Sequence, residues 1–195
     1  MSIGRPLEFD PEQALDSALA VFWSQGYEAT SLQNLLDAMA LSKSSFYQAF
    51  HSKRALFERC LDRYRDQVAS DFGARLNGAA SGRVFIEDVL LGIADEARSR
   101  RKPRGCLVMN TANEFSQRDA RLAKRVAAGV ERFKGVFLAA VQRAQQEGGI
   151  SREHEPDALA DYLVTSITGL RTLVKAGADA ATVEGVVSVI LKALR

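Results

Sequence analysis

Apolar residues recur at intervals of three and four along almost the whole chain, and this period constrains the fold more than any other feature. Such spacing puts apolar side chains on one face of a helix, whereas a half-buried strand needs them at every second position. No run of alternating β-branched residues bounded by hairpin turns occurs in the 195 residues. The sequence therefore predicts an all-α fold of about nine helices.

Three short helices and one long helix are expected in the first part of the chain. Each start offers a side chain that can accept a hydrogen bond from the first helical turn. The predicted starts are Asp10, Thr30 or Ser31, Ser42 and the region of Ser52. In the fourth helix, apolar residues repeat about every four positions over a long stretch. This helix is therefore expected to run from one small domain into the next.

Glycine and small polar residues at 77–82 predict a domain boundary, because they cannot continue a packed helix cheaply. The chain is therefore divided into residues 1–52, a connecting helix at 53–77 and a larger part at 78–195. Helices in the larger part are expected at about 83–101, 106–115, 118–147, 155–175 and 180–194, with ends uncertain by about two to four residues.

The composition is that of a folded protein, with 47% hydrophobic and 26% charged residues. A net charge of +2 means that any nucleic-acid site must depend on local clustering of cations. Cys60 and Cys106 lie far apart and predict free thiols in a reducing compartment. No apolar run is long enough to span a bilayer and no leader peptide is evident, so we expect a cytoplasmic protein without a membrane segment.

Two short helices joined by the turn "MALS" form a helix-turn-helix pattern, whose second helix lies in the segment "SKSSFYQAFHSK" at 42–53. Phe46 and Phe50 can hold this helix on a core while small polar and cationic side chains face outward. Such a face suits the major groove and the phosphates of double-stranded DNA. The expected DNA-binding residues are Arg5, Thr30, Ser31, Ser42, Lys43, Ser44, Ser45, Tyr47, His51 and Lys53.

The alternative is that these helices only pack together and expose a solvated polar face. Residues 1–60 contain more acidic than basic side chains, so charge alone does not decide. The positions of the charged side chains favour DNA binding, because the acidic residues lie mainly on the first helix and the basic residues flank the third.

Residues 18–61 resemble the TetR family of bacterial transcriptional regulators. The matching motifs are FWxxGYxxTS, LLDAMALSKSSFY and FxSKxxLF, and "GRPLEFD" upstream resembles the lead-in of one branch. The resemblance implies a homodimer that usually represses transcription at a palindromic operator and is released by a small-molecule inducer. Ala40 and Ser44 depart from the pattern, since many members have glycine at both positions. If the turn needs a positive φ at Ala40, that residue carries a small strain.

The last two expected helices have more apolar surface than one subunit is expected to cover, which points to a dimer interface of four helices. An internal core is the alternative. The expected interface residues are Leu163, Ile167, Leu170, Val183, Val187, Ile190 and Leu194. A dimer would set two recognition helices about 34–36 Å apart, the spacing of a palindromic site.

The segment "RSRRKPRGC" places five cations before Cys106, at the start of an expected helix. Positive charge and a helix N-terminus both stabilise a thiolate. The "GCL" at 105–107 also resembles a branch of the family in which some members sense electrophiles or oxidants through that thiol. The alternative is a small buried hydrophobic side chain.

An apolar ligand pocket with a few orienting amides is also expected in the larger part. Its proposed lining, with Cys106, is Asn110, Asn113, Phe85, Phe115, Phe133, Phe137 and Tyr162. A surface face next to an ordinary aromatic core is an equal alternative. The two histidines and two scattered cysteines have no metal-ligand spacing, so neither a metal nor another cofactor is expected.

The leading hypothesis is a ligand-responsive transcription regulator that is not an enzyme. A helical enzyme with Cys106 as nucleophile is one alternative, but such a nucleophile needs an adjacent base and the sequence supports no such pair. A small-molecule binding protein with a vestigial DNA-binding domain is the other.

Overall fold

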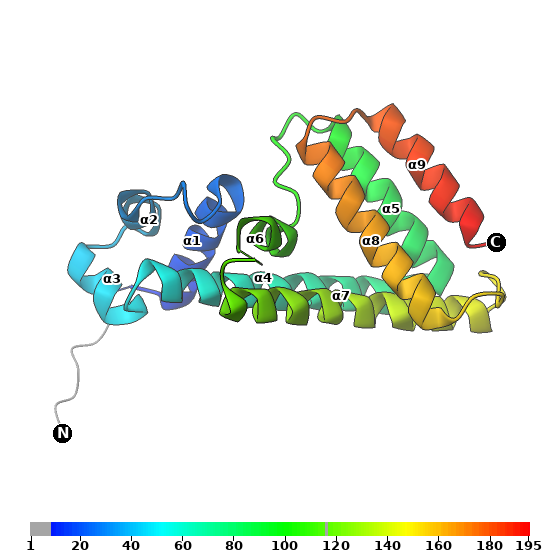
Figure 1. The fold of residues 1–195 in the computed structure, drawn as a ribbon, viewed down its shortest axis with the longest axis horizontal. Coiled ribbons are helices and arrows are strands. Elements are labelled where there is room, and N and C mark those ends of the chain that lie inside the picture. The colour runs from blue at the N-terminus through cyan, green and yellow to red at the C-terminus, as the bar shows by residue number, and fades with distance from the viewer. Residues whose placement is uncertain (1–8, 116) are drawn as a thin grey trace, which may run out of the picture. The chain divides into compact units, whose positions relative to one another are not determined.

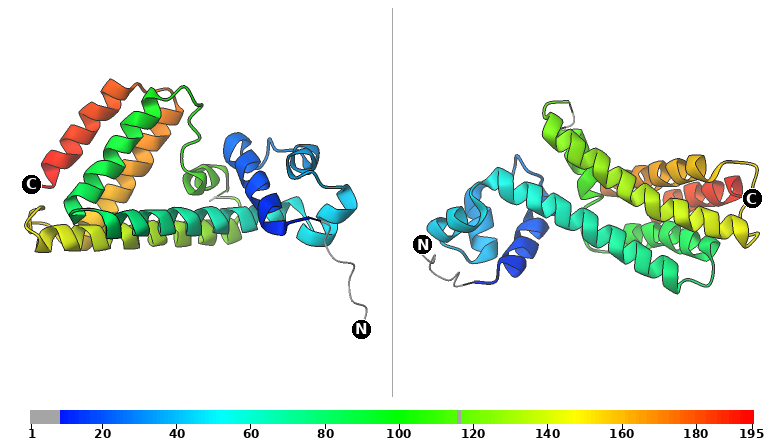
Figure 2. Two further views of the ribbon diagram at one scale, coloured as in Figure 1. Left: turned by 180° about the vertical axis from the view of Figure 1, so that it is seen from behind. Right: turned by 90° about the horizontal axis from the view of Figure 1, so that it is seen from below.

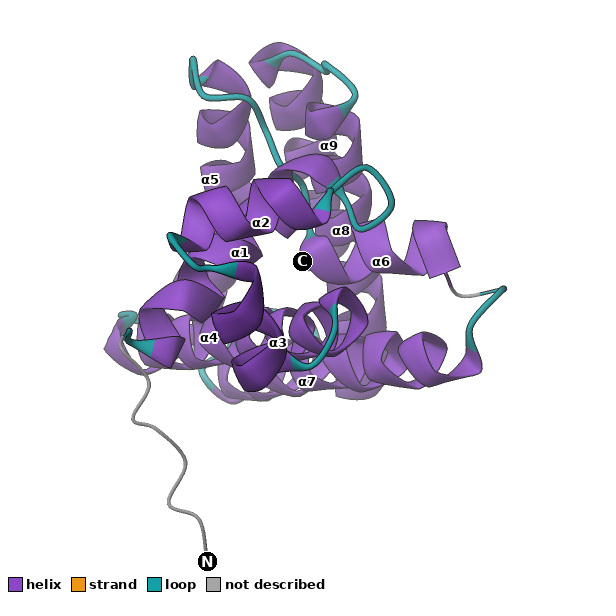
Figure 3. Cartoon of the chain, turned by 90° about the vertical axis from the view of Figure 1, so that its left-hand side faces the viewer, coloured by secondary structure: helices purple, strands orange, loops and turns teal. Residues whose placement is uncertain are grey.

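A computed structural model shows the fold of the protein, and the structure describes residues 9–115 and 117–195. Within these residues the chain forms nine helices and no strand, which confirms the predicted all-α fold (Figure 1 and Figure 3). The helices are α1 (Pro11–Gln25), α2 (Leu32–Met39), α3 (Lys43–Phe50), α4 (Lys53–Gly78), α5 (Gly82–Arg98), α6 (Leu107–Phe115), α7 (Ala120–Gln146), α8 (Pro156–Lys175) and α9 (Ala180–Ala193).

The chain divides into two compact units, and the division falls inside α4 between Tyr64 and Arg65. The N-terminal unit contains α1, α2, α3 and the first part of α4. The C-terminal unit contains the rest of α4 and the helices α5 to α9. The expected division treated residues 53–77 as a separate connecting helix, whereas here the two units share that helix.

Helices of the N-terminal unit begin at capping side chains. The carboxylate of Asp10 accepts the N–H of Glu12 at 2.9 Å. Ser31 and Asn34 form a reciprocal capping box at the start of α2. The Ser42 hydroxyl accepts the N–H of Ser45 at 3.1 Å at the start of α3. These contacts confirm Asp10 and Ser42 as helix starts and decide for Ser31 over Thr30.

The core of the N-terminal unit is aromatic. Phe22 of α1 meets Phe57 of α4 edge to face, with ring centroids 5.0 Å apart. Phe46 and Phe50 of α3 are almost completely buried in the same unit. Cys60 is also buried there, and this burial raises the pKa of its thiol far above the ordinary value. Cys60 is therefore part of the core.

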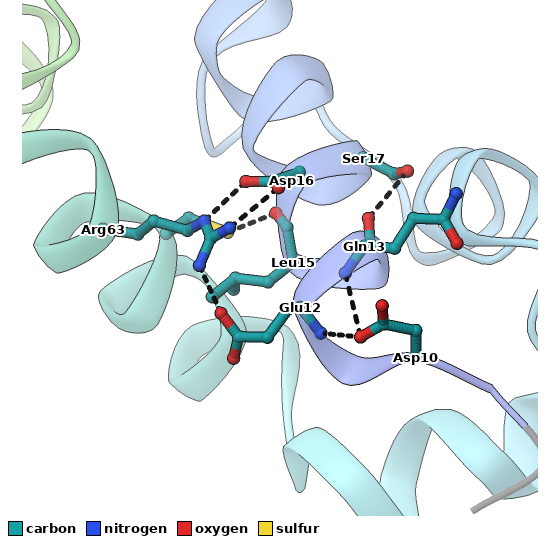
Figure 4. A network of polar contacts seen from close by, with 8 residues as sticks. Asp10, Glu12, Gln13, Leu15, Asp16, Ser17 and Arg63 are labelled. Carbon is teal, nitrogen blue, oxygen red and sulfur yellow. Dashed lines mark hydrogen bonds and ion pairs between the residues drawn. The ribbon is translucent and has the colours of Figure 1, made fainter. Parts of the chain in front are cut away.

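An ion-pair network joins α1 to α4 within this unit (Figure 4). The guanidinium of Arg63 donates to both oxygens of Asp16, with one of these contacts at 2.8 Å, and also to Glu12. Hydrogen bonding to Asp16, then to Glu12, raises the pKa of Arg63. The network fixes α1 against α4 and neutralises acidic residues of α1.

The C-terminal unit is built around α5 and α7. α5 packs against α7, α8 and α9, and α7 also packs against α6 and α8. The views from behind and below show α7 extending along the second part of α4 (Figure 2). Phe72, Phe85 and Phe137 join these helices in a cluster with centroids 5.7–6.3 Å apart.

A polar clamp closes one end of the C-terminal unit. Arg143 donates to the carbonyl oxygens of Leu76 at 2.8 Å and Ala79 at 3.0 Å, in and just beyond the last turn of α4. Glu147 accepts the N–H of Gly82 at 2.9 Å and pairs with Arg143. The Gly82 hydrogen bond, followed by Arg143, lowers the pKa of the Glu147 carboxyl. The clamp satisfies the end of α4 and the start of α5 together.

The seven side chains expected at a dimer interface lie instead inside the chain. Their exposed fractions do not exceed 5%. The members are Leu163, Ile167, Leu170, Val183, Val187, Ile190 and Leu194. α5 packs against both α8 and α9 and covers this stripe, so the expectation is corrected to an internal core.

A strained residue ends α2. Ala40 has φ 53° and ψ 42°, in the left-handed region where a Cβ is disfavoured. The conditional expectation of a small strain at this residue is confirmed, because the turn does need a positive φ at Ala40. The positive φ allows the chain to turn within residues 40–42 before α3 begins.

We expect Ala40→Gly to raise the free energy of unfolding by about 0.5–1 kcal/mol, because glycine adopts positive φ without steric cost. Urea unfolding followed by circular dichroism measures the change. The matched control is Ala38→Gly in the exposed interior of α2, which should lower stability by about 0.5–1 kcal/mol. A decrease for both variants would contradict the assigned strain.

Candidate nucleic-acid interface

The rotation of α3 is fixed by its two buried aromatic side chains. Phe46 and Phe50 face the core of the N-terminal unit, so the opposite side of α3 faces outward. That side carries Ser44, and Tyr47, which is 45% exposed, lies at its edge. Lys43 shares a side with Phe46 and Phe50 but is exposed because it is the first residue of the helix. The tyrosine ring contacts Phe46 edge to face at 5.2 Å, which supports the ring while its outer part remains accessible.

The start of α3 is a group of three hydroxyl side chains. The Ser42 oxygen lies 2.9 Å from the hydroxyl oxygens of both Ser44 and Ser45. Hydroxyl groups donate or accept and can therefore exchange these contacts for phosphate or base-edge oxygens. A helix N-terminus also favours anions. The arrangement is chemically suited to the backbone and base edges of DNA.

Most of the expected DNA-binding residues are accessible. Ser31, Ser42, Lys43, Ser44, Tyr47 and His51 are exposed, and Ser45 and Lys53 are partly exposed. Arg5 lies outside the described residues.

The expectation for Thr30 is corrected. Its side chain is 1% exposed, and its hydroxyl donates to the carbonyl oxygen of Gly26 at 2.6 Å. Thr30 therefore closes the loop between α1 and α2 and is not accessible to DNA. The neighbouring Ser31 remains exposed as the cap of α2.

His51 stands in an unusual backbone conformation between α3 and α4. Its φ is 63° and its ψ is −42°, and the N–H of Ser52 donates to the carbonyl of Phe50 at 2.7 Å. This is a γ-turn with positive φ, a rare and strained type. It reverses the chain within a few residues and leaves the His51 side chain exposed next to the outer face of α3.

Sequence reasoning missed Gln48. This residue follows Ser44 by four positions and precedes His51 by three, so all three share the exposed side of α3. A glutamine amide can donate to and accept from adenine in the major groove. Helical spacing alone places Gln48 on this side, because positions 44, 48 and 51 recur at intervals of four and three.

Charge pairing distinguishes the cations of the N-terminal unit. Arg63 is paired with Asp16 and Glu12, and Arg54 is paired with Glu58 at 2.9 Å. Lys43 and Lys53 have no carboxylate partner within residues 9–115 and 117–195. Arg59, whose guanidinium lies 5.0 Å from the Phe50 ring centroid, likewise has no carboxylate partner in the described residues. Lys43, Lys53 and Arg59 are therefore the cations near α3 that remain available to an anion.

The residues expected to line a ligand pocket occupy different environments. Phe85, Phe115, Phe133 and Phe137 are buried, whereas Asn113 and Tyr162 are exposed. Phe85 and Phe137 pack directly against each other with centroids 5.8 Å apart, as in an ordinary core. A surface cavity of about 320 Å³ is lined by Arg75, Gly78, Ala79, Phe85 and Asp88, and shares only Phe85 with the expected set.

Cys106 lies just before α6 and is 6% exposed. The adjoining loop is tied down by Asn110, whose amide donates to the carbonyl of Arg104 at 3.0 Å. The ammonium of Lys175 at the end of α8 donates to the side-chain oxygen Oδ1 of Asn110 at 2.9 Å. Gly105 has φ 68°, and a Cβ there would lie 3.2 Å from the Lys175 side chain. Asn110 is thus satisfied by protein groups at this loop.

Comparison with known proteins decides the family. Residues 14–60 match the family described as "Bacterial regulatory proteins, tetR family". Residues 86–190 match the family described as "Tetracyclin repressor-like, C-terminal domain". The chain belongs to the TetR family. The second match covers most of the C-terminal unit, which lies beyond the resembling segment at 18–61.

Two relatives of this TetR-family chain align over most of their length. The HTH-type transcriptional repressor ComR of Escherichia coli is 33% identical over 182 residues, which cover 91% of this chain and 85% of ComR. The uncharacterized HTH-type transcriptional regulator YezE of Bacillus subtilis is 30% identical, with 98% of this chain and 100% of YezE covered.

A solved structure of a relative has DNA bound. It is a cysteine-substituted variant of the TetR-family regulator CifR in complex with a 26-base-pair operator. CifR is 30% identical to this chain with a TM-score of 0.83, and the alignment covers 98% of this chain and 100% of the other. The described fold is therefore one that engages operator DNA in a relative.

The described residues offer neither a membrane span nor a metal site. No described helix is both long and apolar enough to cross a membrane. Among the same residues, no group of three or more histidine, cysteine, aspartate or glutamate side chains is arranged to hold a metal ion.

Proposed function

We propose that this TetR-family regulator is a repressor that binds a palindromic operator as a homodimer and is released by a signal received in the C-terminal unit. The observation that carries the proposal is the exposed surface of α3. The hydroxyl of Ser44 and the amide of Gln48 stand there opposite the buried Phe46 and Phe50, and Lys43 is exposed at the first position of the helix. The repressor ComR and the DNA complex of CifR support it by similarity. Since operators lie on the chromosome, the proposed location is the cytoplasm.

The proposed DNA contacts divide into two classes. Lys43, Tyr47, His51 and Lys53 are suited to phosphates, which position the protein on the duplex. Ser44 and Gln48 lie on the face of α3 that would enter the groove and are suited to base edges. The two classes predict different consequences of substitution.

Selection of duplexes from a random pool by the purified protein tests this function. We expect enrichment of a palindrome whose binding weakens steeply with salt, because phosphate contacts release counterions. Lys43→Gln should weaken binding to all sequences and reduce the slope of log K against log salt by about 0.9 for each phosphate that is no longer neutralised.

Gln48→Ala is the matched comparison in the same helix. It should reduce discrimination at one base pair of each half-site by about 1–3 kcal/mol while leaving the salt slope unchanged. The control Gln33→Ala, whose amide pairs with Asp37 on α2, should change no base preference. Absence of any enriched sequence would refute the proposed function.

The proposed dimer surface is the outward face of α8 and α9. The exposed apolar side chains there are Tyr162, Leu173, Val186 and Val189, the last 64% exposed. Gly169 and Gly185 have open space where a Cβ would point, so another helix can approach closely at these positions. A second copy of the chain would cover this surface and place two α3 helices on one operator.

Val189→Asp should weaken the dimer by more than about 100-fold, because burying an unpaired carboxylate costs about 3 kcal/mol or more. Sedimentation equilibrium measures the subunit mass. The matched control is Val84→Asp on α5, an exposed position of the same side-chain type in the first turn of a helix. A Val189→Asp dimer as tight as the control would refute this interface.

The release signal is proposed to be a small molecule or modification of Cys106. The position of Cys106 supports release through modification of its thiol, called here the thiol route. Cys106 immediately precedes α6 and follows a loop with the exposed cations Arg100, Arg101 and Lys102. An enzymatic role is not proposed, because no histidine hydrogen-bonds the Cys106 thiol in the described part of the chain. No metal or other cofactor enters this proposal.

Cys106→Ser should stay on the selected duplex when peroxide or a quinone is added, while the parent protein dissociates. The control is Cys60→Ala, which should dissociate like the parent because burial keeps the Cys60 thiol protonated. Mobility shift measures the bound fraction. Equal dissociation of the Cys106→Ser variant and the parent would exclude the thiol route and leave the small molecule.

A further inference from the structure

Lys53, the first residue of α4, rests on an aromatic ring. Its ammonium nitrogen lies 4.2 Å from the centroid of the Tyr27 ring in the loop between α1 and α2. At this distance the electron-rich face of the ring attracts the cation. The contact joins a loop residue to the side chain at the start of α4 within the N-terminal unit.

The Tyr27 ring is itself firmly held. It stacks on Phe22 with centroids 6.1 Å apart and planes inclined by 16°. It also tilts against Phe57, with centroids 5.0 Å apart. Because Phe22 and Phe57 are at most 1% exposed, Tyr27 extends the rigid core outward to the lysine. The platform under Lys53 is therefore part of the core and not a loose loop side chain.

A neutral platform has a different effect from a carboxylate. Arg63 and Arg54 are held by carboxylates, which compensate their charges. The tyrosine ring holds Lys53 without compensating its charge and occupies only one side of the ammonium. The remaining N–H donors can reach a phosphate, and the start of α4, where the Ser52 hydroxyl accepts the N–H of Ala55 at 3.0 Å, also favours an anion.

We infer that Tyr27 is a positioning residue for the phosphate contact of Lys53. The ring restricts the flexible lysine before DNA arrives, so less side-chain entropy is lost on binding. This inference rests on the proposed DNA-binding function. The hydroxyl of Tyr27 is not required, since the attraction comes from the face of the ring.

A double-mutant cycle tests the coupling. The proteins are the parent, Tyr27→Leu, Lys53→Met and the combined variant, measured on the duplex that the parent protein selects from a random pool. Tyr27→Leu should weaken binding about two- to fivefold for each subunit on the DNA, and should have no effect when Lys53 is already methionine. Tyr27→Phe keeps the ring and should bind like the parent.

The salt dependence separates positioning from folding. Lys53→Met should lower the slope of log K against log salt by about 0.9 for each phosphate that is no longer neutralised, and Tyr27→Leu should lower it by a smaller amount. Thermal unfolding by circular dichroism reports any decrease in folded protein. Equal losses of affinity for Tyr27→Leu in both Lys53 backgrounds, or an unchanged affinity for Lys53→Met on a duplex that the parent binds, would overturn the inference. Failure of the parent to select any duplex would instead overturn the proposed function.

Discussion

Burial of Phe46 and Phe50 sets the rotation of α3 about its own axis, and the candidate interface depends on it. A helix with both rings inside must present Ser44 and Gln48 outside, because these positions lie on the opposite side, and it leaves Tyr47 partly exposed at the edge. The same aromatic core also reaches Lys53 through Tyr27. One apolar cluster thus orients both the groups suited to base edges and a group suited to phosphates.

Sequence alone predicted the elements well and their partners less well. Capping residues such as Asp10 and Ser42 act locally, so their roles can be deduced from neighbouring positions. The apolar stripe that contains Leu163 and Val187 was correctly predicted to be buried. The prediction that a second subunit covers it was wrong, because α5 of the same chain covers it. Periodicity shows which face of a helix is apolar but not which surface packs on that face. Thr30 shows the same limit, because its contact with the Gly26 carbonyl depends on the path of the loop. Gln48 could have been found from helical spacing alone.

The helices α8 and α9 have two different apolar faces. The inner face packs on α5 with large aliphatic side chains, and the outer face combines Tyr162, Leu173, Val186 and Val189 with open glycines. Large residues fill an internal core, whereas small residues allow another helix to come close. The proposed dimer surface would give the outer face a use of its own, which would account for apolar content beyond what the internal core needs.

The division of α4 between two units has a consequence for cooperativity. A helix is costly to nucleate and cheap to extend, so the turns on either side of Tyr64 and Arg65 stabilise each other through the continuous backbone. Loss of structure in one unit would remove helical neighbours from the other, even without any side chain crossing the division. Arg143 binds the carbonyl oxygens at the C-terminal end of α4 and so opposes fraying of that end. Because the helix is continuous, this also stabilises the turns that precede it. Fraying of the last turns of α4 would therefore be felt in the N-terminal unit through the backbone hydrogen bonds of one continuous helix.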